Sequence, residues 1–399
     1  MPLDLSLSVY LLVGPIAWLA LWLGLLLARA RMNRLRGDPK PLPDPPPPLS
    51  IVVPAKDEAA HIEQCVRQLL AQDYPDFELV VVDDRSTDGT RQILDRLAAQ
   101  HAAERGEAGA PTLRVMHVDR LPDGWLGKCH ALHVGTRDLR GRWILFVDSD
   151  VALEPHAARA VLALAARRDY DALSTLNRVQ PRSRWEALMI PLLGASWGTM
   201  FTISLTNDDN RPTVAAANGQ LFLVQRDAYD AVGGHATVRN QIVEDVELMR
   251  ALKSTGHKCR LMIGAHLAST HMHATLPELR RGWGRIFAGT ARYRPARLWA
   301  AIAFTVLSGL SVYPAFGYAV WQAVAHADWR WFVAAGIHWL LMTGFLAYVY
   351  AAARCRWSAA LVPFVSFPVM IGLLWEGLRR CRDRRFEWRG TAVTIPGEA

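Results

Sequence analysis

Residues 141–150 read GRWILFVDSD, and this stretch predicts both the fold class of the chain and the place of its site. The apolar run at 144–147 is typical of a buried strand in a parallel sheet. It ends on the acidic triplet 148–150 at the carboxyl end of the strand, where ligands bind in open α/β sheets. Two carboxylates one residue apart suit a hard divalent cation that shares its oxygen ligands with substrate phosphates. They also suit a solvated turn, so the neighbouring motifs are needed to choose between a cation site and a turn.

Composition and charge indicate a protein with both membrane and soluble parts. The 399-residue chain is 51% hydrophobic and contains 15 Trp, yet 21% of its residues are charged. The formal net charge is +8, and arginine clusters at 29–36, 280–297 and 379–389 each lie beside a hydrophobic segment. This placement favours the positive-inside rule and anionic lipid over nucleic acid as a partner. The five cysteines include no CxxC pair, which is typical of reduced cytosolic thiols.

The N-terminal region is expected to anchor the chain in the inner membrane. Residues 6–28 carry no charge and are long enough to span a bilayer, so 1–30 are predicted to form a retained transmembrane anchor. The arginines that follow place the N-terminus outside and the next domain in the cytoplasm. Residues 31–50 are a basic, proline-rich linker that holds that domain off the membrane.

The C-terminal region at 297–378 is predicted to be a further transmembrane and re-entrant part of a multi-pass protein. It contains three apolar stretches, at 298–325, 331–353 and 357–378. If all three crossed the bilayer, the basic tail at 379–399 would lie outside, against the positive-inside rule. We therefore expect the third stretch, which contains two prolines, to be re-entrant or interfacial and the tail to be cytosolic.

Between these regions, residues 51–296 alternate strand-like and helix-like runs. This alternation predicts βαβ units, and so an α/β domain with a parallel or mixed sheet and helices on both faces. Residues 184–203 are apolar but interrupted by proline and glycine, which suits a buried core helix or an interfacial helix on the membrane; we prefer the latter. The expected strands read LSIVVP (49–54), FELVVVDD (77–84), LRVMHVD (113–119), RWILFVD (142–148), DALSTLN (171–177) and QLFLVQ (220–225).

Two more strands end in acidic pairs at the same edge of the predicted sheet. IVVPAKDE (51–58) continues into Asp57 and Glu58, which also suit the N-terminus of a helix. VVVDDRSTDGT (80–90) ends in Asp83 and Asp84 before a turn that caps the next helix. Capping does not require this second pair, so we expect it to accept hydrogen bonds from a base or ribose.

A lysine and several glycines suggest where a diphosphate would lie. Lys128 in GWLGKCHAL (124–132) follows a glycine at the start of a helix and suits an anionic diphosphate, although the spacing is not that of a Walker loop. The alternative is a surface lysine. NGQLFLVQRDAYDAVGGH (218–235) contains Gly219 and a Gly-Gly turn, which predict tight backbone near a ligand.

The end of the domain supplies a candidate general base and two further candidates. Glu244 and Asp245 in IVEDVEL (242–248) precede an apolar-periodic helix, which suits either a general base or ordinary acid enrichment at a helix start. His271 and His273 form a His-x-His pair that could supply a metal ligand, although we prefer a structural role. The basic aromatic run LRRGWGRIF (279–287) suits lipid headgroups or a diphosphate.

In this order and spacing, the motifs resemble the family-2 glycosyltransferases, which have the Rossmann-like GT-A fold that binds nucleotide sugars. The resemblance covers roughly residues 49–290 and rests on VVPAKDE, VVVDDRSTDGT, GWLGK, VDSD, NGQLFLV and VEDVEL. The anchor, the GW-x-GK segment, the membrane region and WRGT at 388–391 most resemble hopene-associated glycosyltransferases, followed by carotenoid and ceramide glycosyltransferases. The resemblance implies an inverting, metal-dependent hexosyltransferase that moves a sugar from a nucleotide sugar, expected to be a UDP-sugar, to a lipid.

The resemblance also implies a role for each motif residue. Asp245 would be the catalytic base, which takes the proton of the acceptor hydroxyl. Asp148 and Asp150 would form the DXD pair that holds Mg²⁺ or Mn²⁺, with His271 as a further candidate ligand. The nucleotide sugar would be bound by Pro54, Asp57, Glu58, Asp84, Lys128 and Asp148. The acceptor or diphosphate would be contacted by Gly219, Gln220, Glu244, Trp283 and Arg285.

Two departures from the family pattern and three alternative functions complete the prediction. Asp57 stands where the first motif usually carries Asn. Trp283 precedes Arg285, so the QxxRW motif of processive polymerases is not met, which argues against a polysaccharide synthase. The alternatives are a polyprenyl-phosphate glycosyltransferase, a non-catalytic membrane scaffold or nucleotide sensor, and a metal-dependent phosphohydrolase of lipid diphosphates. The last would not need the acid pair at 83–84.

Overall fold

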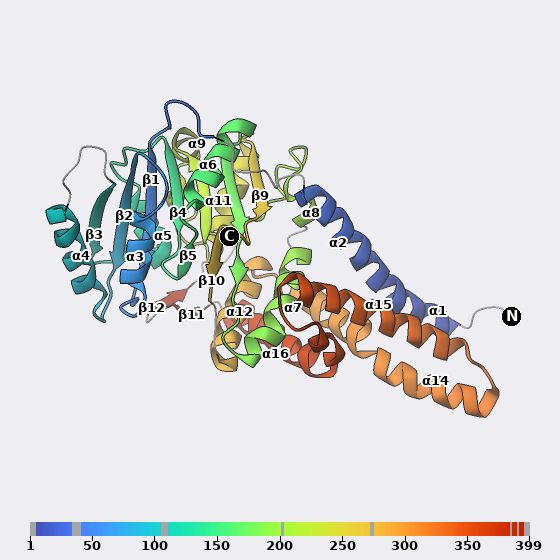
Figure 1. The fold of residues 1–399 in the computed structure, drawn as a ribbon. Helices are drawn as coiled ribbons and strands as arrows, with labels where there is room; N and C mark the ends of the chain where they lie inside the picture. The colour runs from blue at the N-terminus through green and yellow to red at the C-terminus, as the bar shows by residue number, and fades with distance from the viewer. Residues whose placement is uncertain are drawn as a thin grey trace. The chain divides into compact units, whose positions relative to one another are not determined.

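A computed structural model places the WILFV run in strand β4 (Trp143–Val147), inside a seven-stranded sheet with the order β3-β2-β1-β4-β8-β6-β9 (Figure 1). The structure describes residues 5–33, 41–104, 111–200, 203–271, 275–383, 385–388 and 391–394. Residue contacts divide the chain into two compact units. The α/β unit comprises 31–180, 201–271 and 385–399, and the helical unit comprises 1–30, 181–200 and 272–384.

The sheet of the α/β unit is mixed, and all six expected strands are present. β1 through β4 pair in parallel, whereas β8 runs antiparallel to β4 and β6. The expected α/β fold is therefore confirmed, with a parallel half whose strand ends carry the acidic motifs. The other strands of this sheet are β1 (Leu49–Ala55), β2 (Phe77–Asp84), β3 (Thr112–Val118), β6 (Ala172–Leu176), β8 (Leu221–Gln225) and β9 (Cys259–Ile263).

Helices cover both faces of this sheet because successive strand residues point to opposite sides. Ile51 and Val53 of β1 belong to a core shared with α3 (Ile62–Leu70), α4 (Thr90–Glu104) and α6 (Ala157–Arg168). Val52, from the same strand, belongs to a second core shared with α5 (Gly127–Gly135) and α11 (Glu244–Ser254). Phe146 of β4 lies in this second core, so it faces the same side as α5 and α11.

Two small sheets complete the α/β unit. β5 (Val151–Leu153) pairs with β10 (Ala268–Thr270), which pairs with β7 (Arg178–Val179). Since β5 follows β4 after three residues, the acidic triplet 148–150 occupies the turn between two sheets. β11 (Arg385–Trp388) and β12 (Thr391–Thr394) form an antiparallel hairpin. Arg389 and Gly390 of the WRGT stretch lie outside the described residues.

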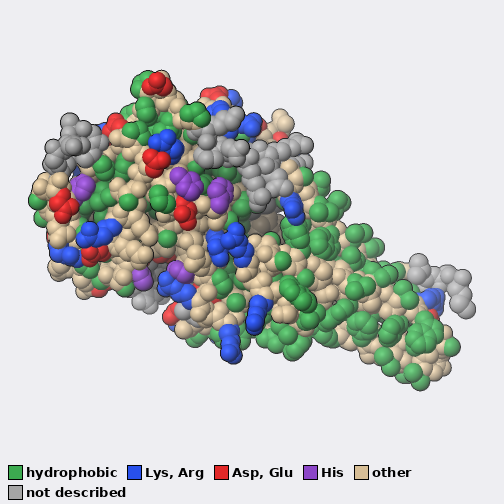
Figure 2. Space-filling model, viewed as in Figure 1, with side chains coloured by type: hydrophobic (Ala, Val, Ile, Leu, Met, Phe, Trp, Pro, Cys, Tyr) green, Lys and Arg blue, Asp and Glu red, His purple; other side chains and the backbone are tan. Residues whose placement is uncertain are grey.

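The helical unit contains three helices that are long and apolar enough to cross a membrane. They run over Leu5–Ala30, Pro295–His326 and Arg330–Ala352. Large apolar side chains on them, such as Leu23 and Leu340, are more than half exposed, as expected for lipid-facing positions. Figure 2 shows hydrophobic side chains over these helices. The first two helices each contain a short π-helical segment, at Leu12–Ile16 and Thr305–Leu310.

The remaining helices of this unit include segments that the sequence analysis grouped with the soluble domain. α7 (Arg184–Met200) and α12 (Leu276–Thr290) pack in its core, where Met189 and Phe287 are fully buried. The third apolar stretch forms a short 3-10 turn (Trp357–Leu361) and then α16 (Pro363–Asp383), which is not among the candidate spans found in the described residues. The other elements are α1 (Leu5–Leu11), α2 (Ala17–Asn33), α13 (Pro295–Phe304), α14 (Val312–His326) and α15 (Arg330–Ala352).

Candidate active site

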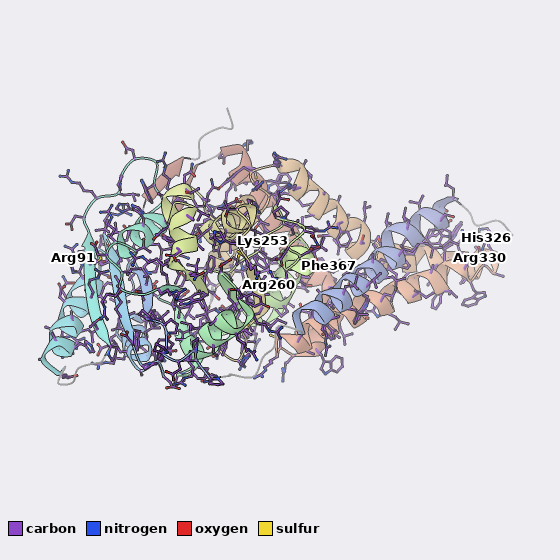
Figure 3. The ribbon with its side chains drawn as sticks, turned by 90° about the horizontal axis from the view of Figure 1, so that it is seen from above. Arg91, Lys253, Arg260, His326, Arg330 and Phe367 are labelled. Atoms are coloured by element: carbon purple, nitrogen blue, oxygen red, sulfur yellow. The ribbon has the colours of Figure 1, made fainter. Side chains whose placement is uncertain are left out.

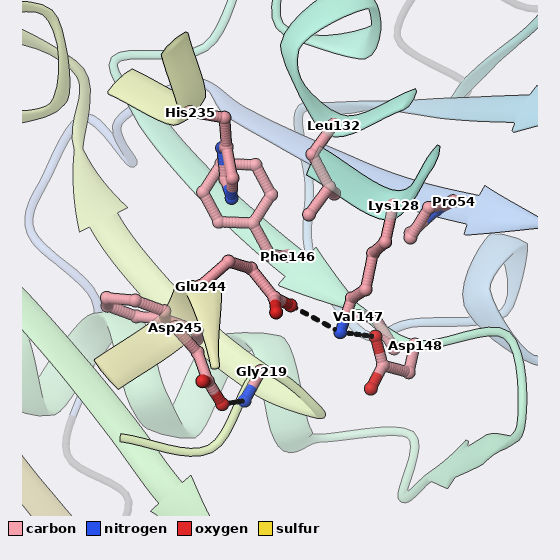
Figure 4. Close-up of a pocket in the computed structure, with 11 residues that line it drawn as sticks. Pro54, Lys128, Leu132, Phe146, Val147, Asp148, Gly219, His235, Glu244 and Asp245 are labelled. Carbon is pink, nitrogen blue, oxygen red and sulfur yellow. Dashed lines mark hydrogen bonds and ion pairs between the residues drawn. The ribbon is translucent and has the colours of Figure 1, made fainter. Parts of the chain in front are cut away.

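A pocket lies at the carboxyl end of β4, within the α/β unit. Six residues that line it were predicted to contact ligands, and they come from five separate segments of the chain: Pro54, Lys128, Asp148, Gly219, and the adjacent pair Glu244 and Asp245. The other lining residues are Leu132, Phe146, Val147, Phe222 and His235. Figure 4 shows a charged group of Lys128, Asp148 and Glu244 beside the apolar side chains of Leu132 and Phe146. The pocket therefore offers both a polar and an apolar wall to a ligand.

Lys128 joins two acidic motifs that are far apart in the sequence. It lies in the first turn of α5, and its Nζ is 2.7 Å from Oδ1 of Asp148 and 2.7 Å from Oε1 of Glu244. Burial lowers the pKa of Lys128, but the carboxylates of Asp148, Glu244 and Asp245 outweigh burial and raise it well above its ordinary value. The lysine is therefore charged and neutralises part of the negative charge of the pocket.

Asp245 is held by two backbone donors. The N–H of Gly219 donates to its Oδ2 over 2.6 Å, and the N–H of Val246 donates to its Oδ1 over 2.8 Å. Burial, together with the neighbouring charge of Glu244, raises the pKa of Asp245 to about 7, even though Lys128 and the two N–H donors oppose the shift. A carboxyl group that titrates near neutrality has the properties of a general base.

Gly219 packs where a side chain would disturb this arrangement. A Cβ atom at this position would lie 3.2 Å from Nζ of Lys128 and 3.5 Å from Oδ2 of Asp245. The glycine expected to allow tight backbone near a ligand thus lies against the two charged groups of the pocket. Gln220 is oriented elsewhere, because its Oε1 accepts a 3.1 Å hydrogen bond from Nδ2 of Asn218, and it does not line the pocket.

The two aspartates at the end of β2, Asp83 and Asp84, have different partners. Asp84 is buried and forms a bidentate ion pair with Arg85, with N–O distances of 2.8 and 2.9 Å. A Cβ atom at Gly127 would overlap the Asp84 carboxylate, which explains the second glycine of GWLGK. Asp83 is fully buried and accepts from Arg91 and His117 over 3.1 and 3.0 Å, so this residue has a structural role.

Asp57 and Glu58 connect two loops and do not line the pocket. Asp57 adopts a left-handed backbone conformation with φ of 53°, which Asn and Asp tolerate better than most residues. Its Oδ1 accepts a 2.7 Å hydrogen bond from the N–H of Thr87. Since this bond needs only an acceptor oxygen, Asp can replace the usual Asn. The N–H of Glu58 donates to Oγ1 of Thr90 over 2.8 Å.

The carboxylates of Asp148 and Asp150 fit a hard divalent cation by their chemistry. Together with Glu58, they lie close enough to Cys65 that burial and their charges raise the pKa of its thiol to about 12. Among the residues that the structure describes, no group of three or more His, Cys, Asp or Glu could hold a metal by itself. A cation bound by two carboxylates must complete its shell with water and substrate phosphate, as Mg²⁺ commonly does.

Three other predicted residues are not brought into the pocket. His271 lies at the end of β10 with its Nδ1 3.0 Å from the carbonyl oxygen of Gln180, and its partner His273 lies outside the described residues. Trp283 and Arg285 are on α12 and so belong to the helical unit. Trp283 is buried there against Phe287, with ring centroids 5.5 Å apart.

Sequence reasoning missed two residues that shape the site. His235 follows the Gly-Gly turn and lines the pocket, and a histidine directly after the two glycines, as the last residue of the quoted motif, was the available signal. Lys253, which is labelled in Figure 3, is buried on α11. Its Nζ donates to backbone carbonyls, the closest being those of Thr206 at 2.6 Å and Val214 at 2.7 Å. This ammonium group fixes the segment that leads to Gly219. A lysine on the apolar face of a predicted helix was its signal.

Comparisons with known proteins agree with the fold. Residues 46–302 match the family described as "Glycosyltransferase like family 2". The 4,4'-diaponeurosporenoate glycosyltransferase of Staphylococcus haemolyticus is 24% identical over 280 residues, which cover 66% of this chain and 69% of that protein. The enzyme of the same name from Staphylococcus aureus strain MRSA252 is also 24% identical, over 265 residues that cover 66% and 67%.

A solved structure is similar over nearly the whole chain. It is the mannosyltransferase PcManGT from Pyrobaculum calidifontis in complex with GDP-Man and Mn²⁺. The TM-score is 0.52 at 18% sequence identity, and the superposition covers 94% of this chain and 99% of the other. At this identity the likeness establishes a common fold.

Proposed function

Because the chain belongs to glycosyltransferase family 2, we propose that it is a membrane-bound, inverting enzyme that moves a sugar from a nucleotide-diphosphate sugar to a lipid. The observation that carries this proposal is the position of Asp245. Its carboxylate is held by two N–H groups, has a pKa raised to about 7, and lies in one pocket with Lys128 and Asp148.

The proposed reaction is a single displacement at the anomeric carbon of the donor. The acceptor oxygen forms a bond to this carbon while the bond to the diphosphate oxygen breaks, and the nucleoside diphosphate leaves. Asp245 takes the proton of the acceptor hydroxyl, a step that typically contributes about 10²- to 10⁴-fold to the rate. Asp148 and Asp150 would hold Mg²⁺ or Mn²⁺, which would stabilise the charge on the leaving diphosphate.

The donor nucleotide is proposed to lie along the carboxyl ends of β1 and β2. Pro54 lines the pocket itself, and Asp84 is buried near the start of α5. Asp57 and Glu58 support the loop between these positions. A UDP-sugar remains our expectation for the donor, and GDP-mannose is the alternative to include, since the solved mannosyltransferase is in complex with GDP-Man.

The acceptor is proposed to be a lipid that carries a hydroxyl group. The relatives are named for 4,4'-diaponeurosporenoate, which is the name of a carboxylate. A carboxylate has no proton to lose at neutral pH, whereas a hydroxyl group must lose one, so a general base at Asp245 favours the hydroxyl. A hydroxylated hopanoid would belong to this class, although only the resemblance of the sequence suggests it and the relatives are named for a carotenoid acid. Three candidate spans support a location in the inner membrane, with both the α/β unit and the basic tail in the cytoplasm.

The direct test is to incubate membranes that contain the full chain with labelled UDP-sugars or GDP-mannose. Each donor is offered with a hydroxylated hopanoid, a carotenoid acid or a polyprenyl phosphate. We expect a lipid-linked sugar from the hydroxylated acceptor and none from Asp245→Asn. Transfer to polyprenyl phosphate alone would support the alternative acceptor. Released phosphate would indicate a phosphohydrolase, and the absence of product with every donor would leave a scaffold or a nucleotide sensor.

A further inference from the structure

His235 is a buried histidine whose ring forms part of the pocket wall. It is 2% exposed, and its ring lies edge-on to that of Phe146, with centroids 4.9 Å apart. Figure 4 shows the two rings side by side, in the part of the pocket that also holds Leu132. This wall is apolar except for the imidazole, so the histidine is the polar group that a ligand lying against it would meet.

The hydrogen bonds of Tyr229 favour one of the two nitrogens of this ring as the one that carries the proton. The backbone N–H of His235 donates to the Tyr229 hydroxyl over 3.0 Å, so that oxygen already accepts one bond. Nδ1 of His235 lies 2.8 Å from the same oxygen, whereas Oγ1 of Thr136 lies 3.4 Å away. The closer atom is the better acceptor for the tyrosine O–H. Nδ1 then accepts, and the neutral ring carries its proton on Nε2.

Two further observations support this assignment. Burial lowers the pKa of His235 to about 3, so the ring is neutral at physiological pH. Gly234 has a φ of 54°, and a Cβ atom there would lie 2.5 Å from the Tyr229 ring. The Gly-Gly turn thus lets Tyr229 come close enough to bind His235. Among the residues that the structure describes, Nε2 of His235 has no hydrogen-bond partner.

We propose that His235 determines donor specificity by donating a hydrogen bond from Nε2 to a hydroxyl oxygen of the sugar. This inference rests on the proposed function. A hexose fits this wall because its C–H groups can pack on Phe146 while one hydroxyl accepts from the imidazole. The diphosphate, in contrast, is expected near Lys128. The histidine would therefore contact the sugar and would not contact the nucleotide.

Two substitutions of His235 distinguish the effect of its N–H donor from the effect of its aromatic ring. His235→Phe keeps an aromatic ring against Phe146 but has no donor, whereas His235→Gln places an amide N–H close to the position of Nε2. Calorimetric titrations of the full chain in detergent would compare UDP-glucose with UDP, and GDP-mannose with GDP. We expect His235→Phe to weaken binding of the accepted nucleotide sugar about twofold to tenfold, the range for one neutral hydrogen bond, and to leave binding of the free nucleotide unchanged. His235→Gln should restore most of the loss.

Equal weakening of the nucleotide sugar and the free nucleotide would overturn the proposal, as would no weakening of either. Because the residue is buried, the variants are compared at equal folded fraction by thermal unfolding. Tyr229→Phe provides a second route: it keeps His235 but removes the hydroxyl that orients its ring, and it should give a smaller loss of the same kind.

A series of monodeoxy sugar nucleotides gives a sharper test. The wild type should discriminate against one deoxy position, and His235→Phe should lose that discrimination alone. If both proteins discriminate alike at every position, the histidine does not contact a hydroxyl. Failure of the proposed function would appear differently, because the wild type would then transfer no sugar to any lipid.

Discussion

The N–H of Gly219 donates a 2.6 Å hydrogen bond to Oδ2 of Asp245, which joins the loop before β8 to the first turn of α11. A second N–H, from Val246, binds the other carboxylate oxygen. Both oxygens are thus held in place while each keeps a lone pair for another partner. A base positioned in this way needs little reorganisation when it takes a proton.

Substitution of Asp245 should lower the rate of sugar transfer but not the affinity for the nucleotide sugar. Asp245→Asn keeps the size of the side chain but removes its basicity, so we expect transfer to fall by at least about 100-fold. Binding of the nucleotide sugar should change by less than about threefold, because the amide oxygen can still accept one of the two N–H groups. Initial rates and calorimetric titration of the same preparations would measure both effects. Near-wild-type rates in this variant would exclude Asp245 as the base.

The raised pKa of Asp245 predicts an acid limb in the activity profile. The base works only when ionised, so kcat/KM should rise with pH up to about 7 and then level off. Stability should respond with the opposite sign. A carboxyl whose pKa is raised from 3.8 to about 7 on folding stabilises the fold when protonated, and this contribution is lost as the pH rises across that interval. Thermal unfolding from pH 4 to 8 should show this slope in the wild type, with a flatter one in Asp245→Asn.

Removal of the charge of Lys128 should disturb both stability and pH dependence. Lys128→Met leaves Asp148 and Glu244 without their shared partner, and we expect a loss of about 1–3 kcal/mol in the free energy of unfolding. Because Lys128 lowers the pKa of Asp245, the acid limb of any residual activity should move to higher pH.

Two control variants test the origin of that loss. Lys258→Met removes an exposed ion pair with Asp169 and should leave the free energy of unfolding little changed, because solvent screens the pair. Lys128→Met combined with Glu244→Gln should recover part of the stability, since one of the two unpaired charges is gone. Equal unfolding temperatures for Lys128→Met and Lys258→Met would contradict the bridging role.

The sequence predicted the structure well where a short local pattern is enough to determine it. A buried apolar run followed by acids predicts a parallel strand and its ligand-binding end. β2, which ends at Asp84, and β4, which ends just before Asp148, are both parallel strands of this kind. It was less informative where pairing depends on distant segments. That Lys128 would contact Glu244, 116 positions along the chain, follows from the tertiary packing of α5 and α11. Likewise, the helical periodicity around Trp283 does not reveal which unit the helix packs in.

The helical unit offers a last test, at a polar contact between apolar helices. His338 on α15 is fully buried, with Nδ1 2.8 Å from the Tyr10 hydroxyl and Nε2 2.9 Å from the carbonyl oxygen of Ser308. These three residues come from the three candidate spans. An ionisable side chain in such a place is costly unless it is hydrogen-bonded, so the contact should stabilise the packing of the spans.

Gly14 makes this contact possible, because a Cβ atom there would lie 2.7 Å from Nδ1 of His338. Gly14→Ala should therefore destabilise the unit by about 1–3 kcal/mol, as overpacking does. Gly24 on the same candidate span is the matched control, since a Cβ atom there meets nothing within 4 Å. Gly24→Ala should be neutral or slightly stabilising, because alanine favours the helix over glycine. Thermal unfolding in detergent would compare the two variants, and an equal response from both would show that the His338 contact does not hold the spans together.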